Sequence, residues 1–165
     1  TRARSVLNGL QFLTSLPDVG PDDWVLVHDA ARCLVRSEAI EALIAACLQH
    51  QHGGLLAQPL ADTLKVAQVN VKGVESVATT LPREGRWLAQ TPQMFPLVAL
   101  RKALENASTQ PADWQAITDE ASAMERLGVS PILIPGGADN FKVTYPSDFA
   151  MAHAILAQRA QKDTQ

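Results

Sequence analysis

A chain of 165 residues is long enough to bury one hydrophobic core, and its 47% hydrophobic and 19% charged content is ordinary for a globular protein. The formal charge of −3 argues against a nucleic-acid-binding surface, which needs a basic stripe. No run of about 18 apolar residues occurs, so no transmembrane helix is expected.

Two cysteines, Cys33 and Cys47, lack the close spacing of a zinc site or a redox pair. No signal-peptide pattern opens the chain, so both are expected to be reduced thiols of a cytoplasmic protein. The first residue is Thr1 rather than Met, which indicates that the chain begins inside a longer protein or was trimmed.

Helices and strands are predicted to alternate along the chain. Apolar residues at helical spacing predict a helix over residues 5–16, and a buried strand follows at 24–28. Ser37 is the expected N-cap of a helix that runs to Leu48. The remaining expected elements are a strand at 54–58, helices at 97–107 and 119–127, strands at 129–135 and 141–144, and a last helix from Pro146 toward Arg159.

Residues 65–88 break this alternation. Valines interleave there with polar residues around Lys72 and Gly73, which predicts a protruding β-hairpin. The alternative is a decorative surface hairpin. An exposed hairpin with this many valines invites aggregation unless something covers it, so a dimerisation arm is favoured.

The element order predicts one α/β domain over residues 1–165, with three α/β/α layers and a mostly parallel sheet. In open sheets of this kind, ligands bind beyond the carboxyl ends of the strands. The polar residues expected near those ends are Asp29, Arg32, Thr63, Thr91, Thr118, Lys142 and Thr144.

Arg, Lys and Thr side chains in such positions suit a phosphate ligand. Simpler interpretations stay open, since Asp29 and Arg32 can pair with each other and Thr118 can serve as a helix N-cap. No nucleophile is paired with a base, and no P-loop or dinucleotide-binding glycine motif is present. The residues alone therefore indicate an α/β domain with a phosphate-binding cleft.

Six segments taken together resemble the 2-C-methyl-D-erythritol 4-phosphate cytidylyltransferase family. They are RARSV at 2–6, VHDAAR at 27–32, DTLK at 62–65, LAQTPQ at 88–93, TDEAS at 118–122 and DNFKVT at 139–144. The resemblance covers essentially the whole chain. It implies a Rossmann-like nucleotidyltransferase fold and a homodimer with interlocking β-arms.

The resemblance also implies a reaction and the residues that carry it. CTP and methylerythritol 4-phosphate would give 4-diphosphocytidyl-2-C-methyl-D-erythritol and pyrophosphate, in non-mevalonate isoprenoid synthesis. Two residues are expected to be catalytic: Arg83 would reach the partner's site from the arm, and Lys142 would position the attacking phosphate. The expected sugar-phosphate residues are Asp29, Arg32, Thr63, Thr91, Thr118 and Thr144, and the expected nucleotide residues are Ser5, Asp29 and Ala30.

Mg²⁺ is expected to be held mainly by the nucleotide phosphates, with Asp29 as a candidate helper and no firm protein ligand. Two departures from the family stand out. Cys33 replaces the usual proline, so that turn lacks a fixed φ. The family's glycine-rich loop and first strand are expected to precede Thr1, which predicts that this chain alone is inactive or weakly active.

Two alternatives remain at this stage. One is a cytidylyltransferase that acts on another sugar phosphate or a pentitol phosphate. The other is a non-catalytic dimeric module that binds a nucleotide.

Overall fold

Four strands form the central sheet of the computed structural model, which describes residues 1–69 and 73–162. Their order is β1-β5-β2-β6, with bounds β1 (Trp24–Val27), β2 (Gly54–Pro59), β5 (Trp87–Pro96) and β6 (Ile132–Pro135). β5 runs antiparallel to both of its neighbours, whereas β2 and β6 are parallel. Three strands therefore share one direction, as a mostly parallel sheet requires, and β5 makes the sheet mixed.

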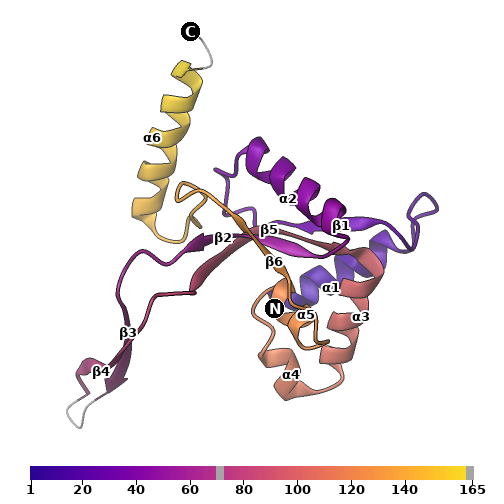
Figure 1. The fold of residues 1–165 in the computed structure, drawn as a ribbon, viewed down its shortest axis with the longest axis horizontal. Coiled ribbons are helices and arrows are strands. Elements are labelled where there is room, and N and C mark those ends of the chain that lie inside the picture. The colour runs from indigo at the N-terminus through magenta and orange to yellow at the C-terminus, as the bar shows by residue number, and fades with distance from the viewer. Residues whose placement is uncertain (70–72, 163–165) are drawn as a thin grey trace.

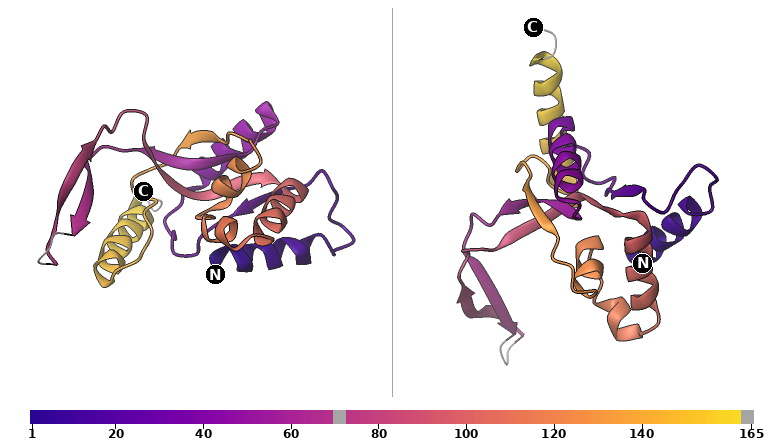
Figure 2. Two further views of the ribbon diagram at one scale, coloured as in Figure 1. Left: turned by 90° about the horizontal axis from the view of Figure 1, so that it is seen from below. Right: turned by 45° about the vertical axis from the view of Figure 1, so that its right-hand side comes forward.

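Helices cover both faces of this sheet (Figures 1 and 2). One face carries α1 (Arg2–Leu13), α3 (Leu97–Ser108) and α5 (Glu120–Glu125), with the short α4 (Pro111–Gln115) beside them, and the other carries α2 (Ser37–His50). The three expected layers are confirmed.

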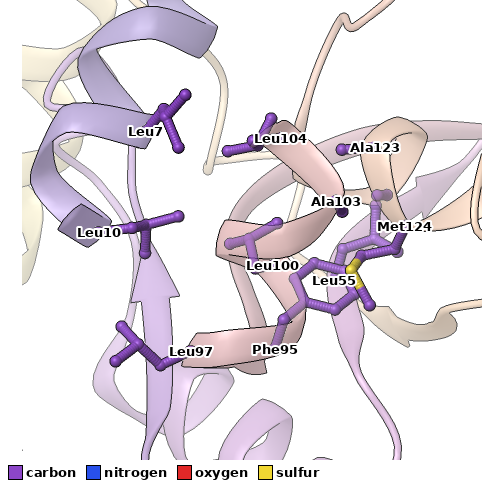
Figure 3. Packing of buried hydrophobic residues seen from close by; sticks show 11 residues of the cluster. Leu7, Leu10, Leu55, Phe95, Leu97, Leu100, Ala103, Leu104, Ala123 and Met124 are labelled. Carbon is purple, nitrogen blue, oxygen red and sulfur yellow. The ribbon is translucent and has the colours of Figure 1, made fainter. Parts of the chain in front are cut away.

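Strand alternation explains why the sheet has two separate cores. Leu55 and Phe95 point into the larger core with α1, α3 and α5, which Figure 3 shows from close by. Their chain neighbours Leu56 and Met94 point to the opposite face and pack against α2.

The predicted hairpin is confirmed as a separate two-stranded sheet, β3 (Leu64–Val69) and β4 (Glu75–Leu81), which protrudes from the body in Figure 1. Gly73 has a φ of 75°, in the left-handed region that favours glycine, and Lys72 lies outside the described residues. The arm ends earlier than expected, because Trp87 and Leu88 already belong to β5. Several of its valines are exposed, including Val69 at 69% and Val77 at 58%.

The last helix, α6 (Pro146–Lys162), starts where the sequence predicts. Arg159 ties it to the body by donating to the Leu34 carbonyl and to Asp139 Oδ2, each at 2.8 Å. Burial alone would raise the pKa of Asp139, but the hydrogen bonds and charges of Arg36 and Arg159 hold it below its ordinary value. Across the described residues, no helix combines the length and the apolar character needed to cross a bilayer.

Both predicted N-caps are wrong by one residue. Arg36 precedes α2 and makes no side-chain cap bond, so Ser37 is the first helical residue. Asp119, rather than Thr118, caps α5, and it exchanges hydrogen bonds with Ser122 in a capping box. A serine three residues after an aspartate was the signal for this cap.

The expected strand at residues 141–144 does not form. Val143 N donates to the Ala31 carbonyl at 2.8 Å, which is a contact with a loop rather than a ladder. This segment is docked against the turn that follows β1 instead of pairing with a strand.

Gly54→Ala is expected to lower the free energy of unfolding by about 1–3 kcal/mol. A Cβ at this position would lie 2.6 Å from Ile132 Cγ1 and 2.9 Å from the Ile132 carbonyl oxygen, on the paired strand β6. Urea denaturation measures the loss. Gly9→Ala is the control: a Cβ on this exposed α1 residue has nothing within 4 Å, so helix propensity should stabilise the protein by about 0.5–1 kcal/mol. Equal stability of Gly54→Ala and the unmodified protein would contradict the packing.

Candidate functional site

A polar cavity of about 250 Å³ lies where β1 ends, beside the middle of β5. Its lining residues come from segments far apart in the chain: Arg2, Asp29, Arg32, Ala89, Gln90, Thr91, Gln93, Thr118, Asp119 and Lys142. Three of these side chains are cationic. Because Asp29 and Arg32 follow the last residue of β1, the cavity lies at the carboxyl end of that strand, where the fold class predicts a ligand site.

The structure brings together half of the predicted site residues. Those that line the cavity are Asp29, Arg32, Thr91, Thr118 and Lys142. Five others are exposed and do not line it: Ser5, Ala30, Thr63, Arg83 and Thr144. Thr63 precedes β3 and Arg83 follows β4, so both belong to the base of the hairpin. Their roles stay predictions.

Asp29 pairs with two cations, and neither of them is Arg32. Its Oδ1 accepts from Arg2 Nε at 2.9 Å, and its Oδ2 accepts from Lys142 Nζ at 3.0 Å. Burial would raise the pKa of Asp29, but the hydrogen bonds and charges of Arg2 and Lys142 outweigh it and hold the pKa below the ordinary value. Asp29 is therefore an ionised counter-ion, and the simple Asp29–Arg32 side-chain pair is wrong.

Arg32 presents a guanidinium that carbonyl groups, rather than carboxylates, hold in place. It donates to the Asn140 carbonyl at 2.7 Å and to the Ala89 carbonyl at 3.2 Å, and in the described part of the chain its Nε has no partner. Burial lowers the pKa of Arg32, yet a guanidinium stays protonated at neutral pH. Among the described residues no carboxylate forms an ion pair with it, so its positive charge can attract an anion into the cavity.

Thr91 fixes the loop that carries these groups. Its Oγ1 accepts from the Asp29 amide at 3.0 Å and lies 3.0 Å from His28 Nδ1, while His28 Nε2 lies 3.2 Å from the Arg32 carbonyl. Since a carbonyl only accepts, His28 Nε2 is the donor to Arg32, and in a neutral imidazole Nδ1 is then the acceptor for the Thr91 hydroxyl. One histidine and one threonine therefore lock both ends of the loop.

Asn140, which the sequence did not single out, anchors the segment that carries Lys142. It is 3% exposed, and its Nδ2 donates to Gln90 Oε1 at 3.0 Å and to the Thr91 carbonyl at 2.9 Å. These bonds dock residues 139–143 onto β5. Lys142 reaches the cavity as a consequence.

The sequence also did not single out Arg2 and Glu120 as site residues. Arg2 donates to both carboxylate oxygens of Glu120, at 2.6 and 2.9 Å, and so connects α1 to α5. Both residues fall inside the segments that resemble the family, but nothing in the spacing links positions 118 residues apart. Burial lowers the pKa of Arg2, and the bonds to Glu120 and Asp29 outweigh this and raise it above its ordinary value.

The donor set of the cavity does not form a metal site. Both oxygens of Asp29 already accept from cations, and the described residues contain no cluster of three His, Cys, Asp or Glu side chains that could hold a metal ion. The arrangement of cations and hydroxyls suits a phosphate-bearing ligand instead.

Comparison with known proteins agrees with this chemistry. The model of the 2-C-methyl-D-erythritol 4-phosphate cytidylyltransferase family matches residues 1–158. The family's enzyme from Chromobacterium violaceum is 54% identical over 159 residues, which is 96% of this chain and 65% of that protein. A bifunctional IspD/IspF enzyme from Albidiferax ferrireducens is also 54% identical, over 99% of this chain and 36% of that protein. The chain thus spans about two thirds or less of these relatives.

Solved structures show the same fold. A crystal structure of 4-diphosphocytidyl-2C-methyl-D-erythritol synthase matches with a TM-score of 0.82 and 44% identity, covering 94% of this chain and 67% of that chain. The cytidylyltransferase from Thermus thermophilus matches with a TM-score of 0.76 and 30% identity, covering 94% of this chain and 68% of that chain.

Proposed function

The chain belongs to the 2-C-methyl-D-erythritol 4-phosphate cytidylyltransferase family, and from this premise we propose that it transfers a cytidylyl group from CTP to methylerythritol 4-phosphate. The observation that carries the proposal is the convergence of Arg2, Arg32 and Lys142 on one cavity. A reaction between two phosphate-bearing substrates needs this kind of charge neutralisation.

The reaction fits a site without a paired nucleophile and base. An oxygen of the acceptor phosphate attacks the α-phosphorus of CTP, and the bond from that phosphorus to the α,β-bridging oxygen breaks to release pyrophosphate. The acceptor phosphate is already ionised near neutral pH, so no strong general base is required. Lys142 and Arg32 would hold the acceptor phosphate in line and offset its charge.

Mg²⁺ belongs to this proposal as part of the nucleotide substrate. Since the cavity residues do not form a metal cage, we assign Mg²⁺ to the phosphates of CTP, where it neutralises their charge. Asp29 then serves as counter-ion to Arg2 and Lys142. The free thiols of Cys33 and Cys47 support a cytoplasmic location.

The β3–β4 hairpin is the proposed dimerisation arm. It protrudes from the sheet and exposes valines on both strands, including Val66 and Val77. A second copy that covered these side chains would remove apolar surface from water. Thr63 and Arg83, which lie outside their own chain's cavity, would then act at the partner's site.

Pyrophosphate release by the complete protein tests the function. We expect release only when CTP, Mg²⁺ and methylerythritol 4-phosphate are all present. A pentitol phosphate in place of methylerythritol 4-phosphate, and ATP in place of CTP, are the matched controls. Faster release with the pentitol phosphate would reassign the acceptor. A folded protein that binds CTP but turns over none of these acceptors would indicate a binding module.

A further inference from the structure

We propose that Glu120 is a positioning residue that acts through Arg2 and Asp29 to hold the ammonium group of Lys142 at the cavity. The catalytic consequence rests on the proposed function. The chain of contacts itself is a property of the fold and has a test of its own.

The first link is the ion pair between Glu120 and Arg2. Glu120 is 1% exposed, and a buried carboxylate is costly unless it is paired and hydrogen-bonded. Arg2 satisfies both of its oxygens in a bidentate pair, at 2.6 and 2.9 Å. Such a pair fixes the plane of the guanidinium as well as its position.

The second link is the hydrogen bond from Arg2 to Asp29. With two donors committed to Glu120, Arg2 directs Nε at Asp29 Oδ1 over 2.9 Å. The guanidinium is rigid and planar, so the bond to Asp29 is set by the bonds to Glu120. Asp29 itself lies in a loop after β1, and its two carboxylate oxygens contact Arg2 and Lys142.

The third link reaches Lys142. Asp29 Oδ2 accepts from Lys142 Nζ at 3.0 Å, and among the described residues no other hydrogen-bond partner holds that ammonium. The Lys142 side chain is 48% exposed on a flexible four-carbon stem. Its place at the cavity therefore depends on where Asp29 is held.

A purely structural role for Glu120 in anchoring α5 is redundant. Gln93 Oε1 accepts from the Ala121 amide at 2.8 Å, and Gln93 Nε2 donates to Asp119 Oδ2 at 2.8 Å. The capping box of Asp119 and Ser122 closes the same helix end. α5 is thus fixed to β5 without the Glu120 side chain.

A purely electrostatic role predicts an effect of opposite sign. Glu120→Gln removes one negative charge beside a cavity that attracts phosphate, so Coulomb attraction alone would strengthen anion binding. The positioning role predicts a loss instead, because Arg2 keeps Asp29 as its one anionic partner and draws it away from Lys142.

A double-mutant cycle on stability tests the network without reference to activity. Glu120→Gln and Lys142→Ala are made singly and together in the complete protein, and urea unfolding gives each equilibrium constant. The two sites do not touch, so additivity is the default. We expect the effects to be non-additive by about threefold in that constant. If the two single changes multiply the unfolding equilibrium constant independently, within error, the network is overturned. Glu125→Gln, an exposed change on the same helix, should show no coupling to Lys142→Ala.

The same variants test the catalytic consequence. Glu120→Gln is expected to lower kcat about tenfold with the KM for CTP nearly unchanged, and to cause no further loss in the Lys142→Ala background. An equal loss in both backgrounds would overturn the positioning role, and so would tighter acceptor binding with full turnover. If the unmodified protein has no cytidylyltransferase activity, the proposed function fails and the stability cycle alone decides the network.

Discussion

Lys142→Ala in the complete protein is expected to lower kcat for cytidylyl transfer by about 100- to 1,000-fold. The ammonium group lines the cavity together with Arg32, and its side chain is 48% exposed, so it can contact a ligand in the cavity. Loss of a positioned charge costs more in the transition state than in substrate binding, so kcat should fall more than KM rises.

Steady-state kinetics and thermal unfolding together check this expectation. Lys142 makes a partly exposed ion pair with Asp29, which contributes less than about 1 kcal/mol to stability, so the melting temperature should fall by only about 1–3 °C. Lys102→Ala, an exposed change on α3, is the matched control and should leave both quantities unaltered. A Lys142→Ala enzyme within about tenfold of the unmodified rate would remove Lys142 from the catalytic role.

The sequence predicted the helices and the buried strands because their signal is local. Apolar residues at a period near 3.6 predicted α1, and short apolar runs predicted β1 and β2. The alternation of Leu55 and Leu56 between two cores follows from the same reasoning. Such patterns depend only on which face of an element is buried.

The sequence did not predict β5, because polar residues and prolines interrupt its apolar pattern. The run from Trp87 to Pro96 combines three polar residues, Gln90, Thr91 and Gln93, with two prolines, so it does not look like a strand in the middle of a sheet. Burial of Gln90, Thr91 and Gln93 is possible because they bond to loops and to α5. These partners are distant in sequence.

The site residues also divide into those with a local sequence signal and those that depend on distant contacts. Residues next to strand ends, such as Asp29 and Arg32, could be predicted because topology places strand ends together. Glu120 and Asn140 could not, since their importance lies in contacts 118 and 50 positions away along the chain. The choice of Lys142 rather than Arg32 as partner of Asp29 was equally invisible, because it depends on how residues 139–143 dock.

Arg83→Ala is expected to lower activity about 100-fold, and mixing it with Lys142→Ala should restore activity. Arg83 is exposed, donates to the Ala61 carbonyl of its own chain and does not line that chain's cavity, so a catalytic role requires it to act on a second copy. In the proposed dimer, random exchange of subunits makes half of the dimers mixed, and each mixed dimer would have one intact site. The recovered activity should therefore be roughly a quarter of the unmodified value.

Native mass spectrometry verifies the exchange on which this result depends. Mixing Lys142→Ala with Asp29→Ala is the control, because both changes damage the cavity of their own chain and no mixed dimer regains an intact site. Recovery in the first mixture alone would assign Arg83 to the partner's site and make the hairpin part of the active site. No recovery, with exchange proven, would mean that each chain builds its site without Arg83 of another copy, and the hairpin would then serve association only.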